Sequence, residues 1–253
     1  ALSLADADEM IAAAWTAKRV LRVFENVLFY PPVQKAKTLI DAGAIGEPLS
    51  IRIKANKGDP RTAWPVPALA RAWRQDTNLS GGGPMTFDDG HHKFALAWHF
   101  MGLAEEVHAW IGRTEIEPGF ALDCPAQISW KFSGGRYGNL EVVYSPELTV
   151  LTEQYAQHDP VEITGSKGVI VITRGHGRIA DQAPVILYAA GKMREFTDMD
   201  ASWAASFSEA TRAHIDVLLD GGTPTLTGEQ GRDILRFCLA AQQSAREGRA
   251  VKV

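Results

Sequence analysis

Four segments of the chain alternate apolar and polar residues with a period of two, and this pattern restricts the fold more than any other feature. Residues 49 to 55 place Leu, Ile, Ile and Ala on one side and Ser, Arg and Lys on the other. The same alternation recurs at residues 107–111, 126–132 and 140–144. It is typical of strands with one face on a core and the other in solvent. We therefore expect these segments to form one open sheet.

Residues 161 to 172 predict a hairpin, because two β-rich runs flank the glycine-bounded turn Gly165-Ser-Lys-Gly168. The turn lacks Walker spacing and leads into a strand, so a hairpin is favoured over a phosphate loop. Helical spacing of apolar residues predicts the remaining regular elements. These helices are expected at residues 3–16, 33–42, 203–220 and 228–247.

The first thirty residues form a separate unit in our interpretation. Residues 3 to 16 predict a helix, and the β-rich run Val20–Phe24 follows it, as in one αβ unit of a parallel sheet. One such unit cannot close a dinucleotide-binding domain alone. We expect an α+β protein in which residues 1–30 are a partial Rossmann remnant. Residues 31–253 then form a catalytic domain with an open, mostly antiparallel sheet covered by helices on one face, and the last helix can pack back on the remnant.

Composition narrows the class of protein. The chain has 253 residues, 45% of them hydrophobic, and a formal net charge of -4 without a dense basic run. Nucleic acid is therefore not an expected partner, and no apolar run is long enough for a membrane span. Cys124 and Cys238 lack metal or redox spacing and are expected to be buried thiols in a reducing cytoplasm.

The segment from Trp73 to His92 carries the residues best suited to chemistry. Three glycines at 81 to 83 and a proline precede an apolar helical pattern, which predicts a loop leading into a helix. Asp88 and His92 are four residues apart and would share one helix face within hydrogen-bonding reach. A carboxylate in that position raises the proton affinity of an imidazole, as a general base requires. The alternative is a surface pair near a helix N-terminus with no role in catalysis.

Further residues, inside this segment and outside it, are candidate ligand contacts. Arg74 could hold a substrate hydroxyl or phosphate, and Trp73 could pack against a sugar ring or serve only the core. His91 could contact substrate or point to solvent, because consecutive helical residues diverge by about 100°. Glu25 and Asn26 follow the predicted strand, where ligands approach α/β sheets, although they could also only form a turn. No metal site is expected, since His91, His92, His99 and His108 lack a zinc-binding spacing.

These motifs resemble those of the Gfo/Idh/MocA oxidoreductases, which include glucose-fructose oxidoreductase and inositol dehydrogenase. Members carry a Trp-Arg pair, a triple-glycine loop and an Asp-x-Gly-x-His motif, matched here at 73–74, 81–83 and 88–92. Segments 41–47, 162–168 and 244–249 resemble the family's helix-ending turn, sheet hairpin and terminal helix. Their order agrees along essentially the whole chain.

The resemblance implies a function. Asp88 and His92 would be catalytic, with His92 taking a hydroxyl proton while hydride leaves the same carbon of a sugar, polyol or glycoside for NAD or NADP. Glu25 and Asn26 would lie on the cofactor side, and the uncovered sheet face would mediate a homo-oligomer, a dimer or tetramer. In the family a lysine of a Glu-Lys-Pro motif completes the proton relay, and this chain begins just after the matching point. It also contains no Gly-x-Gly-x-x-Gly between strand and helix, so we expect the chain alone to be inactive.

Two other functions are alternatives to a simple dehydrogenase. A related enzyme could cleave glycosides by transient oxidation and return the hydride, which would release an aglycone without net NADH. A cofactor-free sugar-binding module would bind a sugar without any NADH signal.

Overall fold

A ten-stranded sheet forms the body of the protein, whose structure, a computed structural model, describes residues 1–253. The strand order is β11-β10-β9-β8-β1-β6-β5-β2-β12, with β7 paired to β1. The strands are β1 Pro48–Lys57, β2 Ala104–Ile111, β5 Ala126–Phe132, β6 Tyr137–Tyr144, β7 Gln157–His158, β8 Val161–Gly165, β9 Gly168–Ile172, β10 Val185–Ala189, β11 Lys192–Phe196 and β12 Val251–Lys252. β3 Thr114–Glu117 and β4 Phe120–Leu122 form a separate small hairpin.

The sheet is open and mostly antiparallel, as predicted, and only β1 and β6 run parallel. Alternation of burial along β1 sets its orientation: Ile51 and Ile53 are fully buried, whereas the intervening Arg52 is exposed. A one-residue slip would move the charged side chains into the core, so this alternation also fixes the register. The predicted hairpin is confirmed as β8 and β9.

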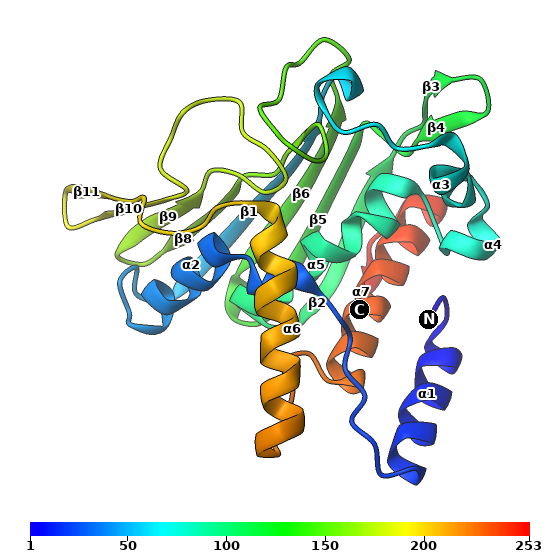
Figure 1. Ribbon diagram of the computed structural model, residues 1–253, viewed down its shortest axis with the longest axis horizontal. Coiled ribbons are helices and arrows are strands. Elements are labelled where there is room, and N and C mark those ends of the chain that lie inside the picture. Colours follow the sequence, from blue (N-terminus) through cyan, green and yellow to red (C-terminus); the bar gives the residue numbers. More distant parts are fainter.

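Helices cover one face of the sheet (Figure 1). The helices of the chain are α1 Leu4–Thr16, α2 Pro31–Asp41, α3 Ala68–Ala72, α4 Thr77–Ser80, α5 Gly90–Met101, α6 Trp203–Asp220 and α7 Gly228–Glu247, of which α1 packs on α7 and not on the sheet. α5 and α7 pack side by side on the sheet, and the Phe94 ring of α5 lies 4.6 Å from Phe237 and 5.9 Å from Trp130, measured between centroids. These contacts fix one side of α5 in the core, so its other side is held in a set orientation. None of the helices is long and apolar enough to cross a membrane.

The four predicted helices are present, and their ends carry the expected caps. Ser3 accepts a hydrogen bond from the Asp6 amide at the start of α1. Thr227 and Gln230 form a reciprocal capping box at the start of α7, which satisfies two amides that the helix itself cannot. Cys124 and Cys238 are buried thiols.

The predicted strand Val20–Phe24 is wrong. This segment forms only an isolated bridge between Arg22 and Thr227, because no neighbouring strand of the chain lies beside it to complete a ladder. It instead packs on α7, where a Cβ on Gly231 would lie 2.3 Å from a methyl carbon of Val23. α7 also contacts α1 through the Arg232 guanidinium and the Asp8 carboxylate (Nη2 to Oδ2 2.9 Å).

Candidate functional site

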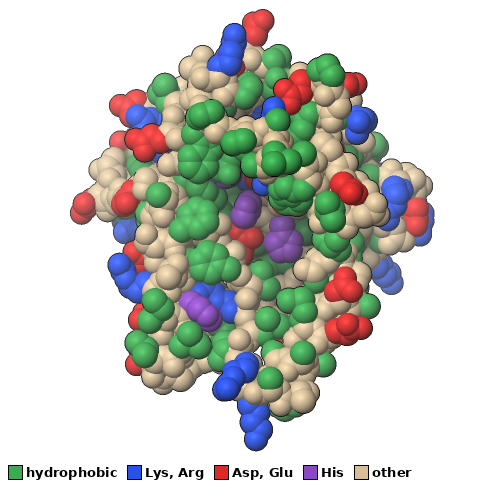
Figure 2. Space-filling view, turned by 45° about the vertical axis from the view of Figure 1, so that its right-hand side comes forward, with side chains coloured by type: hydrophobic (Ala, Val, Ile, Leu, Met, Phe, Trp, Pro, Cys, Tyr) green, Lys and Arg blue, Asp and Glu red, His purple; other side chains and the backbone are tan.

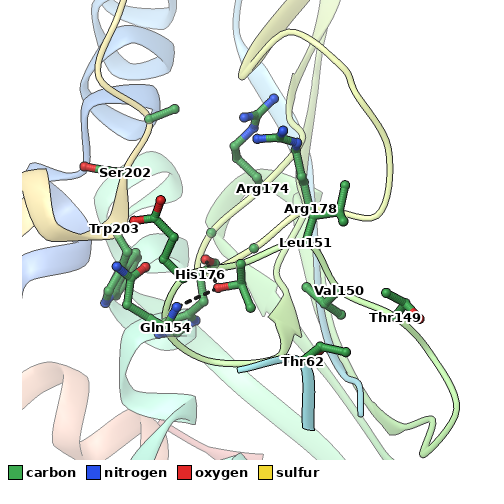
Figure 3. Close-up of a pocket in the computed structure, with 15 residues that line it drawn as sticks. Thr62, Thr149, Val150, Leu151, Gln154, Arg174, His176, Arg178, Ser202 and Trp203 are labelled. Carbon is green, nitrogen blue, oxygen red and sulfur yellow. Dashed lines mark hydrogen bonds between the residues drawn. The ribbon is translucent and has the colours of Figure 1, made fainter. Parts of the chain in front are cut away.

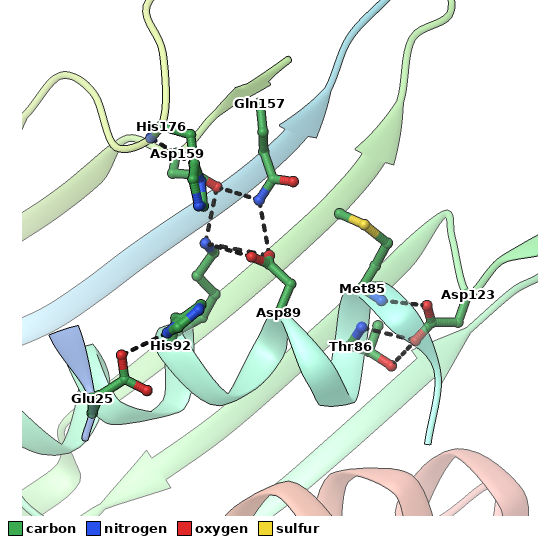
Figure 4. Close-up of polar contacts among 10 residues, drawn as sticks. Glu25, Met85, Thr86, Asp89, His92, Asp123, Gln157, Asp159 and His176 are labelled. Carbon is green, nitrogen blue, oxygen red and sulfur yellow. Dashed lines mark hydrogen bonds and ion pairs between the residues drawn. The ribbon is translucent and has the colours of Figure 1, made fainter. Parts of the chain in front are cut away.

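The triple-glycine loop leads into a short π-helix, Pro84–Asp88, directly before α5. Gly81 has a φ of +82°, a conformation that residues with a Cβ rarely adopt. A Cβ on Gly83 would lie 2.1 Å from the Asp123 carboxylate. That carboxylate accepts hydrogen bonds from the amides of Met85 (2.7 Å) and Thr86 (2.8 Å), so it caps the start of the π-helix (Figure 4). Sequence reasoning missed Asp123, which comes from the loop before β5.

His92 is held by a buried carboxylate, but this carboxylate belongs to Glu25 and not to Asp88. His92 Nδ1 lies 2.6 Å from Glu25 Oε1, and Glu25 is only 4% exposed. The Glu25 carboxylate also accepts a hydrogen bond from the Val27 amide at 3.2 Å. The His92 side chain keeps 28% of its surface exposed, so one edge of a firmly oriented imidazole can be reached from outside.

The expected pairing of Asp88 with His92 does not occur in the structure, and the π-helix explains why. The amides of Asp88 and Asp89 bond the carbonyls five residues earlier, those of Gly83 and Pro84, so the chain is wound more widely here than in an α-helix. Regular i to i+4 pairing therefore begins one residue later, where Asp89 contacts Lys93. Asp88 instead accepts a hydrogen bond from Arg74 Nε at 2.6 Å.

The pair formed by Glu25 and His92 is electrostatically matched. Burial of the His92 ring lowers its pKa, but the charge and hydrogen bond of Glu25 outweigh this effect, and the net pKa is raised. Burial raises the pKa of Glu25, and the opposing effect of His92 leaves it below its ordinary value. Both shifts favour the ion pair, so the imidazole holds a proton more readily than a free histidine.

A buried charged network adjoins this pair (Figure 4). Lys93, 2% exposed, lies 3.0 Å from Asp159 Oδ1 and 3.3 Å from Asp89 Oδ2. The Gln157 amide group donates to both carboxylates, and Asp159 Oδ2 lies 2.8 Å from His176 Nδ1. Burial lowers the pKa of Lys93, but the two carboxylates outweigh it and raise the pKa well above its ordinary value. The network ties α5 to the segments around residues 157 to 176, and sequence reasoning missed it.

Trp203, at the start of α6, packs near both His92 and His176. Its ring lies 4.2 Å from the His176 ring and 6.2 Å from the His92 ring, measured between centroids. Beyond it lies a cavity of about 590 Å³ lined by residues that include His176, Arg174 and Gln154 (Figure 3). In the space-filling view, histidine and acidic side chains lie at the bottom of a hollow whose rim carries many hydrophobic side chains (Figure 2). The arrangement gives an oriented imidazole, an aromatic wall and a polar cavity in one region.

The predicted substrate contacts occupy two places. Trp73, 38% exposed, lies under the Arg74 guanidinium at 4.6 Å, so these two residues and Asp88 form one cluster. His91 points elsewhere: its Nδ1 lies 3.5 Å from the Cys238 sulfur on α7, and it borders the groove between α1 and α7. His91 is partly buried against α7 and does not point fully to solvent, and burial lowers the pKa of its ring. Its role in substrate binding stays a prediction.

The residues predicted to contact a dinucleotide are engaged in internal contacts. Glu25 binds His92, and Asn26 Nδ2 donates to Ser206 Oγ at 2.6 Å while Asn26 is 4% exposed. No glycine-rich turn connects a strand to a helix in the structure, and Gly228 and Gly231 of α7 lie against side chains of the segment 21–23. The residues of this chain therefore do not form a pyrophosphate cradle of the Rossmann type.

Comparison with known proteins agrees with this architecture. The model of the family described as "Oxidoreductase family, C-terminal alpha/beta domain" matches residues 37–253. The chain belongs to this family, the Gfo/Idh/MocA oxidoreductases.

The individual relatives share less than 30% of their residues with this chain. The chain is 26% identical to the D-apiose dehydrogenase of Rhizobium rhizogenes and 28% identical to the myo-inositol 2-dehydrogenase of Thermotoga maritima, in each case over 100% of this chain and 70% of the relative. Its fold is similar to that of an oxidoreductase from Agrobacterium radiobacter in complex with NAD+, L-tartaric acid and magnesium. That match has a TM-score of 0.78 at 22% identity and covers 99% of this chain and 70% of the other.

Proposed function

We propose that the protein provides the substrate-binding and proton-transfer site of an NAD(P)-dependent dehydrogenase that oxidises a secondary alcohol of a sugar, polyol or glycoside. The observation that carries the proposal is the His92 imidazole, held at 2.6 Å by a buried carboxylate and open on one edge. The relatives named as D-apiose and myo-inositol dehydrogenases support a polyhydroxylated substrate.

The chemistry follows from which nitrogen of His92 is engaged. With Nδ1–H donating to Glu25, the lone pair on Nε2 is available to accept a hydroxyl proton, and Glu25 stabilises the imidazolium that forms. The raised pKa makes His92 a better proton acceptor than an isolated histidine, and in the reverse reaction the same group returns the proton. Arg74, oriented by Asp88, and Trp73 would then contact other parts of the substrate.

The redox half of the reaction lies outside the site described above. A bound nicotinamide would take the hydride from the carbon that carries the hydroxyl, but no residue of this chain is assigned to hold it. We therefore propose that these 253 residues bind the substrate and transfer its proton, but do not bind the dinucleotide by themselves. Whether the partner cofactor is NAD or NADP depends on residues that follow the second Rossmann strand.

The test compares His92 with His99, a second histidine on α5. His92→Asn is expected to lower kcat/KM for NADH formation by at least about 100-fold, the usual contribution of a positioned general base. The matched variant His99→Asn, seven residues further along the same helix, should change it far less. NADH formation is measured on the natural protein with D-apiose, myo-inositol and related polyols as substrates. Calorimetry on the 253-residue chain measures the binding of these polyols.

Equal losses in the two variants, or no NADH formation with any polyol, would overturn the proposal. Release of an aglycone from a glycoside without net NADH would replace it with the glycoside-cleaving reaction.

Self-association through the uncovered sheet face is a second part of this proposal. Trp110, Tyr137 and Tyr188 point outward from β2, β6 and β10 and are each more than half exposed. Exposed aromatic side chains of this kind are common at interfaces between subunits. Sedimentation should show a dimer or larger assembly that the variant Tyr137→Lys weakens, and a monomer at all concentrations would refute the idea.

A further inference from the structure

The cavity beyond Trp203 contains two arginines whose charges have few partners. The Nε atoms of Arg174 and Arg178 are buried and have no hydrogen-bond partner. A terminal nitrogen of Arg174 bonds the carbonyl of Gln182, which carries no full charge. The nearest carboxylate to Arg178 is that of Asp181, at 4.0 Å and 96% exposed. Such an arrangement leaves guanidinium donors without an anion to accept from them.

The two arginines lie on one side of the same cavity. Both line the cavity of about 590 Å³, and Figure 3 shows their side chains on the same wall, across from Trp203 and His176. Burial lowers the pKa of Arg174 and the nearby charge of Arg178 lowers it further, while Tyr30 and Asp181 oppose these effects only in part. Glu153 is the one acidic residue in the lining, and its side chain is exposed. An added oxyanion would bring an opposite charge and several acceptor atoms to these donors.

The cavity also lies beside the candidate proton acceptor. Trp203 borders the cavity, and its ring is 6.2 Å from that of His92. Trp203 is only 5% exposed, so a sugar or polyol that reaches both places would extend from the imidazole into the cavity past the edge of this ring. Guanidinium groups bind carboxylates and phosphates through charged hydrogen bonds, which are shorter and stronger than those to neutral groups.

We propose that Arg174 and Arg178 bind an oxyanion, a carboxylate or a phosphate ester, of an anionic sugar or polyol whose hydroxyl group reaches His92. This inference rests on the proposed function and narrows its substrate class, from polyols in general to acidic ones. Neutral sugars would enter the same space but would leave both guanidinium groups without an anionic partner.

The experiment uses ligand sets that differ only in one terminal group. Calorimetry measures the Kd of galactose, galacturonate and galactose 6-phosphate, and of glucitol, gluconate and glucitol 6-phosphate, for the 253-residue chain at low salt. We expect at least one anionic ligand to bind about 10- to 100-fold more tightly than its neutral counterpart, the range for one or two charged hydrogen bonds. The carboxylate and phosphate arms identify which oxyanion is preferred.

Charge-removing variants then locate the preference. Arg174→Gln and Arg178→Gln should each remove most of it, whereas Arg174→Lys and Arg178→Lys should keep part of it. The control Arg212→Gln removes an equal charge from an exposed site on α6, where Arg212 pairs with Glu209, and should leave the preference unchanged. If Arg174→Gln fails to fold, as circular dichroism would show, Arg178, whose side chain is 41% exposed, still provides the comparison.

The inference is overturned if no anionic ligand binds more tightly than its neutral counterpart. It is also overturned if the glutamine variants weaken neutral and anionic ligands by the same factor. Its failure differs from failure of the proposed function: NADH formation that depends on His92 but prefers neutral polyols would keep the function and reject the anion site. Arginine-dependent anion binding without any NADH formation would do the reverse.

Discussion

Replacement of Glu25 by glutamine tests the central contact of the site with little change of shape. The amide can still accept a hydrogen bond from His92 Nδ1, but the negative charge 2.6 Å from the ring is lost. Burial then becomes the main influence on the imidazole, so the pKa of His92 should fall below that of an exposed histidine. The replacement therefore separates the effect of the charge from that of the hydrogen bond.

The magnitude follows from the strength of hydrogen bonds to charged groups. Such bonds contribute about 1.5 to 3 kcal/mol, against about 0.5 to 1.5 for neutral ones, so Glu25→Gln should cost on the order of 1 to 1.5 kcal/mol where both partners are charged. A loss of that size corresponds to a roughly tenfold lower kcat/KM if the imidazolium is stabilised to the same extent during reaction.

The cost should depend on pH in a defined direction. Because the folded pKa of His92 is raised, its contribution to stability is complete below its unfolded pKa, about 6.5, and is lost as pH rises through the folded pKa. The folded pKa of Glu25 is lowered, so its contribution is present above its unfolded pKa, about 4.3, and is lost as pH falls through the folded value. The wild-type advantage over Glu25→Gln should therefore be largest at about pH 5 to 6 and smaller at about pH 9.

Urea unfolding at these pH values measures the stability difference, and the imidazole signals in proton NMR report the pKa of His92. Assignment uses His91→Asn, since Glu25 also acts on the His91 ring. Glu209→Gln, on the exposed side of α6, is the control for loss of one carboxylate. A pKa of His92 that stays the same or rises in Glu25→Gln, or a stability loss that grows toward high pH, would refute the reasoning.

Three further substitutions test the surrounding structure through urea unfolding. Lys93→Met leaves Asp89 and Asp159 buried without their cation and should cost about 3 to 5 kcal/mol; a neutral effect would mean that the network is open to water. Phe237→Ala removes a ring that is 2% exposed beside α5 and should also cost about 3 to 5 kcal/mol, with a smaller loss indicating that the site collapses around the cavity. Thr227→Ala removes the capping box of α7 and should cost about 1 kcal/mol, and no loss would show that another group caps the helix.

The fold could be predicted from sequence where local patterns determine structure. The two-residue alternation of residues 49 to 55 requires one buried face, and the capping residues Ser3 and Thr227 mark helix starts within three residues of their partners. The segment Val20–Phe24 shows the limit of such patterns. Its composition favours a strand, but a strand needs a neighbour, and none lies beside it in the structure.

The site was less predictable because its main contacts join distant parts of the chain. His92 and the loop that precedes its helix could be found from glycines, a proline and a following helical pattern, all within about twenty residues. Its partner Glu25 is 67 positions away, and Asp159 is 66 positions from Lys93, so no spacing rule connects either pair. Glu25 and Asn26 were singled out as ligand contacts, whereas burial shows that both side chains are engaged inside the protein.

The π-helix explains why Asp88, four residues before His92, does not hold its ring. One extra residue in the turn shifts Asp88 toward Arg74 and places Asp89 in register with Lys93. The two neighbouring carboxylates thus face different partners, one in the cluster with Arg74 and Trp73 and one inside the charged network. If the turn were an ordinary α-helix, Asp88 would compete with Glu25 for the imidazole, and Arg74 would lose its orienting contact. The widened turn therefore leaves His92 with a single carboxylate partner, as a general base with one free nitrogen requires.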